Sequence, residues 1–535
     1  MIQYLQQRKW AVFWAVILFG ITLVPYVMGF AIQGEEWRFT GFVFGVEDGN
    51  SYIAKMMIGA NGDWLFRTPY TTAPQKGMLA FLPYLLFGKL TSQPGQHEQM
   101  IALFQVFRFI GILLACLAAY DFISIYVSNS PWRRFGVVIM TVGGGLGWLS
   151  IFGLKGAGYN NLPIDLYSPE TFGFLGLFGL PHLAVSRALL VWGWTRYLKP
   201  EALFKKSMVQ GTVIGGLWLV MGFFQPLNVV TAWAGLGASF IVMAILSILR
   251  TRSVKKAVQD PDIQRSFLRI LAAVMVSSPW VLYNLFALRL DPFLKEWTSQ
   301  NIIMSPPISD YLVGFSLLLI PALIGFWLFC RRPSKEGSLL IGFIFLFPIL
   351  AYLPFNLQRR LPDGIWWVFT ALAITGLSAL PFRWQKTGQW IMSLGTLSSI
   401  FLLMGGIFAV IHPSEPMYIP VSNVHAFQAI RHDWKVSERA VILADYQISN
   451  QVPAWLPANV FIGHGPESVN LHEIQPETEG ILKASTLTEK QKQFLRDAGT
   501  DYVIISGEVP TWITEYGKII SEEDGISVFR LDIVE

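Results

Sequence analysis

The stretch 46–55 carries the residue types best suited to chemistry, because Glu47 and Asp48 are adjacent in it. A carboxylate can accept the proton of an attacking nucleophile and so act as a general base. Asp48 is the first candidate for this role, and Glu47 is the second. The alternative is that Asp48 or Asn50 only caps a helix that begins near Ser51, since both residue types are common at that position, and that Glu47 is only solvated.

An arginine pair, Arg359 and Arg360, lies in the short polar turn 356–364 between two apolar runs. Guanidinium groups bind phosphate through two parallel hydrogen bonds, so a lipid-phosphate head group is a natural partner. The alternatives are that the pair reaches to the membrane surface or forms an ion pair with Asp363. The phosphate contact and these two alternatives all stay open from the sequence.

His182 and Arg187 lie at the start of the apolar run 181–198. An ionisable side chain inside a membrane span is costly and usually faces a cavity, which favours a cavity position for Arg187. For His182, a position at the membrane interface without a functional role is the simpler interpretation. Asp165 and Glu170 precede the run, and either could pair with Arg187 or form a second acidic contact.

The composition of the 535-residue chain predicts the elements that must position these side chains. It is 53% hydrophobic and 14% charged, whereas soluble domains are about 25% charged, so we expect a polytopic membrane protein. Residues 412–535 carry 9 basic and 18 acidic residues, and residues 1–411 carry 31 and 17. This contrast predicts an α-helical membrane domain over 1–411 and a separate soluble domain over 412–535.

Apolar runs long enough to cross about 30 Å of hydrocarbon predict eleven spans. They are 10–30, 99–127, 135–153, 181–198, 207–224, 228–249, 268–288, 311–330, 338–355, 365–382 and 389–411. The run 77–90 is shorter and is expected to form an interfacial or re-entrant helix in the loop 31–98. With this count every inner loop is basic, as the positive-inside rule requires. The loop 31–98, the turn 356–364 and the tail are therefore expected outside.

The tail has the alternating signals of a small α/β domain. Residues 441–444, 501–505 and 525–531 are expected to form strands, and 488–495 a capped amphipathic helix. Four further patterns predict no site. The glycine-rich segment 141–147 lacks the ending of a phosphate loop and favours close helix packing. The tail histidines have no metal-ligand spacing, the two cysteines form no disulfide framework, and the basic excess fits loop charges better than nucleic acid.

The order of these features resembles the GT-C glycosyltransferase superfamily, in particular its bacterial members that use polyprenyl-phosphate-linked sugars. The resemblance rests on the Glu47-Asp48 pair after the first span, Pro181-His182 opening a later span, and the turn with Arg359-Arg360 and Asp363-Gly364. It also rests on the acidic tail, with its segments 462–465 and 499–504.

The resemblance implies inverting transfer of a hexosyl or pentosyl unit from a polyprenyl-phosphate donor to a cell-envelope glycan, lipid or protein. It implies a multi-pass protein of the bacterial inner membrane, contacting membrane lipids, with no metal or other cofactor. Asp48 would be the base, with Glu47 as its substitute. The candidate substrate contacts are Tyr52, Lys55, Asp165, Glu170, His182, Arg187, Arg359 and Arg360. The alternative functions are a transporter or lipid-handling protein, or an inactive GT-C-like scaffold.

Overall fold

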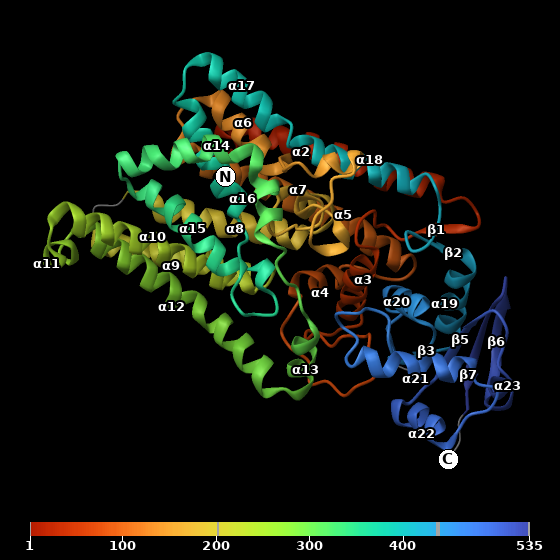
Figure 1. Cartoon of the computed structure of the whole chain (residues 1–535). Helices are drawn as coiled ribbons and strands as arrows, with labels where there is room; N and C mark the ends of the chain where they lie inside the picture. The colour runs from red at the N-terminus through yellow and green to blue at the C-terminus, as the bar shows by residue number, and fades with distance from the viewer. Residues whose placement is uncertain (1, 201–202, 435–438, 533–535) are drawn as a thin grey trace. The chain divides into compact units, whose positions relative to one another are not determined.

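The computed structural model describes residues 2–200, 203–434 and 439–532. It divides into two compact units, each built from separate stretches of the chain (Figure 1). The first, here the helical unit, comprises Met1–Thr22, Val106–Leu285 and Ile302–Gly405. The second, here the mixed unit, comprises Leu23–Gln105, Phe286–Asn301 and Gly406–Glu535. The boundary between a membrane domain over 1–411 and a soluble domain over 412–535 stays a prediction.

In the described residues, six helices are long and apolar enough to cross a membrane. They are α2 (Lys9–Ile32), α5 (Gln96–Tyr126), α10 (Leu227–Thr251), α12 (Pro261–Leu290), α14 (Ile308–Arg331) and the pair α17 (Phe382–Ser393) and α18 (Thr396–Val410). Inside the hydrocarbon of a membrane, the backbone N–H and C=O groups have no water to bond with. They must therefore pair within the segment, as they do in a helix. The chain is therefore a multi-pass membrane protein.

The helical unit contains several further helices. They are α1 (Ile2–Gln7), α6 (Ser130–Val142), α7 (Gly173–Gly179), α8 (Pro181–Leu198), α9 (Phe204–Gly222), α11 (Val254–Val258), α15 (Lys335–Ala351) and α16 (Ile365–Ser378). Its 3-10 turns are η1 (Gly147–Phe152), η2 (Tyr159–Asn161), η3 (Ile164–Leu166) and η4 (Gln358–Arg360). The helices α14, α15 and α16 pack against one another. Eleven spans are not confirmed, because α6 and α16 have only 13 and 14 residues.

The predicted span 135–153 is wrong as one continuous helix. The helix α6 ends at Val142, and Gly143 is extended. The carboxylate of Asp165 accepts hydrogen bonds from the backbone N–H groups of Gly145 (2.9 Å) and Gly147 (3.0 Å), so it holds the chain in a turn. Close packing of small residues in this segment is confirmed, since a Cβ on Gly145 would lie 2.4 Å from the carbonyl oxygen of Gly314.

In the mixed unit, residues 440–531 form a five-stranded sheet of order β4-β3-β5-β7-β6. Its strands are β3 (Ala440–Leu443), β4 (Ala458–Val460), β5 (Tyr502–Ser506), β6 (Gly517–Glu523) and β7 (Ile526–Leu531). The strand β3 is parallel to both β4 and β5, whereas β7 is antiparallel to β5 and β6. The strands predicted over 441–444, 501–505 and 525–531 are confirmed.

Helices cover both faces of this sheet. The first face packs on α19 (Val421–Asp433) and α20 (Tyr446–Trp455). The second packs on α21 (Leu471–Lys483), α22 (Glu489–Ala498) and α23 (Thr511–Tyr516). Alternate residues of β5 point to opposite faces, with Ile504 in the first core and Ile505 in the second. The predicted capped helix is α22, and Thr488 and Gln491 form its capping box.

The remaining elements of the mixed unit come from earlier in the chain. The helices are α3 (Val46–Ala60), α4 (Leu82–Gly88) and α13 (Pro292–Gln300), and a two-stranded sheet pairs β1 (Trp37–Phe39) with β2 (Tyr418–Pro420). The helix predicted within 77–90 is thus present but shorter. The helix α3 packs against α4 and α20. The amide of Asn50 on α3 donates to the side-chain oxygen of Asn450 on α20 at 2.7 Å.

Candidate functional site

The two adjacent acids lie in the first turn of α3, which begins at Val46. The residue before it, Gly45, has φ +57° and makes no side-chain cap. The alternative that Asp48 or Asn50 caps a helix starting near Ser51 is therefore wrong, because both residues lie inside the helix. The N-terminal end of a helix favours negative charge. Both carboxylates are exposed, so Asp48 is positioned to meet a substrate from solvent.

Asp48 is held from one side by His464, which precedes α21. The Asp48 Oδ1 atom lies 3.2 Å from Nε2 of His464, and the exposed fractions of the two side chains are 54% and 5%. The other ring nitrogen, Nδ1, lies 3.6 Å from Oε1 of Glu467. The buried imidazole therefore stands between an exposed carboxylate and a buried one, and it limits the rotamers that Asp48 can adopt.

Glu467 is the centre of a buried polar network. Its Oε1 atom is 2.5 Å from Nζ of Lys55 and also accepts a hydrogen bond from Ser51 at 3.0 Å. Its Oε2 atom accepts from Thr68 at 2.9 Å. Burial raises the pKa of Glu467, but the charges of Lys55 and His464 and these hydrogen bonds outweigh burial and hold it below its usual value. Glu467 is thus ionised at neutral pH.

Lys55 is 1% exposed, and Ser51 also accepts a hydrogen bond from its ammonium group. Its Nζ atom lies 4.5 Å from the ring centre of Phe81. Tyr52 stacks on Tyr84 with ring centres 4.8 Å apart. The structure therefore places Lys55 inside the network that holds His464, whereas Tyr52 is only partly buried beside it.

Glu47 has a separate partner on α20. The hydroxyl of Tyr446 donates to Oε2 of Glu47 at 3.3 Å and accepts from the backbone N–H of Gly465 at 2.9 Å. Burial raises the pKa of Tyr446 to about 12, and the charge of Glu47 adds to the rise. The tyrosine is therefore a protonated donor at neutral pH. Both acids of the pair are thus fixed by residues of the C-terminal part of the chain.

The helical unit contains a second cluster, in which Arg187 pairs with Asp363. The Nε atom of Arg187 lies 2.6 Å from Oδ1 of Asp363, and the two side chains are 3% and 0% exposed. Arg187 also donates to the backbone oxygens of Pro169 (2.5 Å) and Glu170 (2.8 Å). The expectation that the carboxylate of Asp165 or Glu170 pairs with Arg187 is wrong. The pair instead joins α8 to the turn before α16.

The predicted arginine pair lies in η4 of the same unit. Arg360 has its Nε atom 3.2 Å from Oε1 of Glu170, and its side chain is 38% exposed. Arg359 lies over the ring of Tyr167, with 5.1 Å between Cζ and the ring centre. Among the described residues, no carboxylate lies within ion-pair distance of Arg359. The alternative that Asp363 neutralises these arginines is wrong, because Asp363 is bound to Arg187.

Two further candidates have clear positions. His182 lies in the first turn of α8 and is partly buried. Asp165 is 3% exposed, and besides the two glycine N–H groups it accepts a hydrogen bond from Ser398 at 2.7 Å. Asp165 therefore holds the backbone in the described structure. Whether any candidate contacts a substrate stays a prediction.

The sequence alone did not identify the partners His464, Glu467 and Tyr446. A weak signal exists on α3, where residues 48, 51, 52 and 55 recur at helical spacing and therefore share one face. A second signal is the spacing of His464 and Glu467, three residues apart. Neither pattern indicates that the two segments meet.

No protein-family model and no curated protein matches this chain. Among solved structures, it is similar to the arabinofuranosyltransferase AftD from mycobacteria, with a TM-score of 0.53 and 13% identity over 97% of this chain and 40% of that one. It is also similar to the Archaeoglobus fulgidus oligosaccharyltransferase tethered with an acceptor peptide, with a TM-score of 0.50 and 13% identity over 92% and 69% of the two chains. The chain has the GT-C fold.

A third likeness, to ArnT from Cupriavidus metallidurans bound to undecaprenyl phosphate, has a TM-score of 0.48 and 12% identity over 97% and 98% of the two chains. The GT-C resemblance drawn from the motifs is confirmed at the level of the fold. Within this GT-C fold, the acids follow the first long helix and the arginines lie in a turn between α15 and α16. Function must be argued from these residues, because a fold hosts many activities.

Proposed function

We propose that this chain is a membrane glycosyltransferase that moves one sugar from a polyprenyl-phosphate carrier to an acceptor outside the bacterial inner membrane. The observation that carries the proposal is the arrangement of Asp48. This carboxylate is 54% exposed, yet His464 holds it and a buried ion pair supports His464. A fixed, accessible carboxylate is what a general base requires.

The reaction is one substitution at the anomeric carbon. An acceptor hydroxyl attacks that carbon from the face opposite the phosphate, and Asp48 takes the hydroxyl proton. The bond between the anomeric carbon and the phosphate oxygen breaks, and the lipid phosphate leaves with the electron pair. Configuration is therefore inverted. Glu47 is the substitute base, and Oε2 of its carboxylate already accepts a hydrogen bond from Tyr446.

Arg359 and Arg360 are the proposed contacts of the leaving phosphate. Preorganised positive charge stabilises the negative charge that develops on a leaving group. Arg359 suits this role because no acid neutralises it in the described residues. Arg360 keeps an exposed side while Glu170 orients its Nε edge. His182, Tyr52 and Glu170 remain proposed substrate contacts, whereas Arg187, Asp165 and Lys55 are proposed to position the two clusters. No step of this mechanism uses a metal.

The test uses purified protein in proteoliposomes, labelled hexosyl and pentosyl polyprenyl phosphates, and a cell-envelope fraction as acceptor. Asp48→Asn is expected to lower the transfer rate by about 10²–10⁴-fold, the usual contribution of a general base. The matched control is Glu35→Gln, because Glu35 is an exposed acid of the same loop and should transfer at the wild-type rate. Wild-type rates for Asp48→Asn and Arg359→Ala, at equal protein levels, would contradict the proposal.

A further inference from the structure

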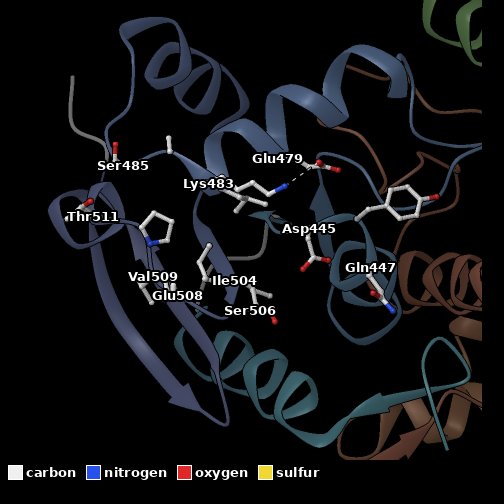
Figure 2. Close-up of a pocket in the computed structure, with 15 residues that line it drawn as sticks. Asp445, Gln447, Glu479, Lys483, Ser485, Ile504, Ser506, Glu508, Val509 and Thr511 are labelled. Atoms are coloured by element: carbon white, nitrogen blue, oxygen red, sulfur yellow. Dashed lines mark ion pairs between the residues drawn. The ribbon is translucent and has the colours of Figure 1, made fainter.

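A large cavity lies in the C-terminal part of the mixed unit, and neither Glu467 nor Lys55 lines it. Its volume is about 770 Å³, and its walls come from the residues after β3, the end of α21, and the segment from β5 to α23. Figure 2 shows Asp445, Ile504 and Ser506 on one side, with Glu479 and Lys483 on the helix α21 opposite them. Volumes of 300–1,000 Å³ are typical of ligand sites.

The cavity lies where the sheet topology predicts a ligand site. The chain leaves the carboxyl end of β3 through α20 on the first face, and it leaves the carboxyl end of β5 through α23 on the second. The parallel neighbours β3 and β5 therefore have connections on opposite faces. Their carboxyl ends are separated at this switch point, which leaves a crevice between them. The residues that line the cavity include Asp445, just after β3, and Ser506, at the end of β5.

The lining has the chemistry of a site for hydroxyl groups rather than for anions. It carries three carboxylates, from Asp445, Glu479 and Glu508, against one lysine, Lys483, which lies 3.8 Å from Glu479. The segment after β3 contains no glycine, so it lacks the loop that cradles a phosphate. Carboxylates and hydroxyls are good partners for the donors and acceptors of a sugar. The hydroxyl-bearing lining residues are Tyr446, Ser485, Ser506 and Thr511.

The cavity is next to the acid pair through Tyr446. This residue lines the cavity, and its hydroxyl donates to Glu47, the neighbour of Asp48. We propose that the cavity binds a saccharide segment of the acceptor, whose attacking hydroxyl is then presented to Asp48. The assignment of the saccharide to the acceptor rests on the proposed function. Saccharide binding itself rests only on the cavity, its place at the switch point and its lining.

The test measures binding of the full-length protein in detergent to an array of bacterial envelope oligosaccharides. Ser506→Trp fills the cavity from an exposed position and is expected to weaken binding at least tenfold. Glu508→Gln keeps the volume but removes a charged acceptor, and an approximately tenfold loss is expected. The matched control is Glu515→Trp, because Glu515 is exposed on α23 outside the cavity lining, and binding should equal that of the wild type.

The outcomes separate this inference from the proposed function. Array binding that is lost only in the cavity variants supports the saccharide site. Absence of array binding by the wild type, or equal binding by Ser506→Trp, overturns the site even if sugar transfer is observed. If the cavity variants lose glycan binding but the wild type transfers no sugar, the saccharide site stands and its assignment to an acceptor is overturned. With active wild-type protein, a raised acceptor KM in Ser506→Trp at unchanged donor KM supports the acceptor assignment, and an unchanged acceptor KM overturns it.

Discussion

Removal of the negative charge from Glu467 should destabilise the mixed unit strongly. The ion pair with Lys55 spans 2.5 Å, and the two side chains are 5% and 1% exposed. At an effective dielectric constant of about 20, two charges at this distance attract by about 6–7 kcal/mol, and desolvation offsets part of this. Removing one member of a buried pair leaves an uncompensated charge and costs about 3–5 kcal/mol. We expect this loss for Glu467→Gln, because the ammonium of Lys55 stays buried.

A double-variant cycle tests the reasoning. Lys55→Met removes the other charge, so the double variant Lys55→Met/Glu467→Gln should recover most of the lost stability. Thermal unfolding of the full chain in detergent, followed by tryptophan fluorescence, reports the change. The matched control is Glu489→Gln, whose ion pair with Lys492 is 2.9 Å long but has 80% of the Glu489 side chain exposed. Water and salt screen an exposed pair of this kind, so it contributes little to stability. A Glu467→Gln variant no less stable than Glu489→Gln would refute the reasoning.

Three further predictions follow from the same residues. The folded state holds the pKa of Glu467 below its usual value of 4.5, so its contribution to the free energy of unfolding should be complete above pH 4.5 and lost as pH falls through the lower folded value. The stability difference between wild type and Glu467→Gln, measured from pH 7 to pH 3.5, should therefore shrink as the pH falls. A constant difference would contradict the shift. Arg359→Lys keeps a charge but loses the two-pronged hydrogen bonding of the guanidinium group, so sugar transfer should fall about tenfold or more. The control Arg383→Lys, at an exposed arginine, should transfer at the wild-type rate. Equal rates for both variants would argue against a phosphate contact. Transfer should also be insensitive to a chelator such as EDTA, measured as the rate before and after dialysis, and loss of activity that Mg²⁺ or Mn²⁺ restores would overturn the metal-free mechanism.

Local patterns in the sequence predicted much of the fold. The capping box at Thr488 and the alternating apolar residues of β7 are short-range signals, so they place α22 and β7 correctly. The break in the helix after Val142 was missed because the apolar run continues through it, although the consecutive glycines 143–145 are a local signal of a helix end. The hydrogen bonds that cause the break come from Asp165, about twenty residues later in the chain. Hydropathy alone contains no information about such a partner.

The candidate site was predictable only in part, for the same reason. Asp48 and Arg359 stand out by residue type and by their places after apolar runs. The groups that hold Asp48 come from a segment 416 residues further along the chain, and no periodic pattern connects the two. The sequence also suggested that Arg187 faces a cavity, because the arginine lies within an apolar run. No pattern in the sequence indicates that Asp363 is buried beside Arg187 and pairs with it.

The pairing of β1 with β2 has a consequence for biosynthesis. These strands join residues 37–39 to residues 418–420, and Lys55 meets its carboxylate partner across 412 positions of sequence. A ribosome must therefore synthesise the chain as far as Glu467 before Lys55 gains this partner. Until then the ammonium of Lys55 has no Glu467 to neutralise it, so burying this side chain earlier would leave an unpaired charge. A nascent chain released before residue 467 cannot assemble the acid site.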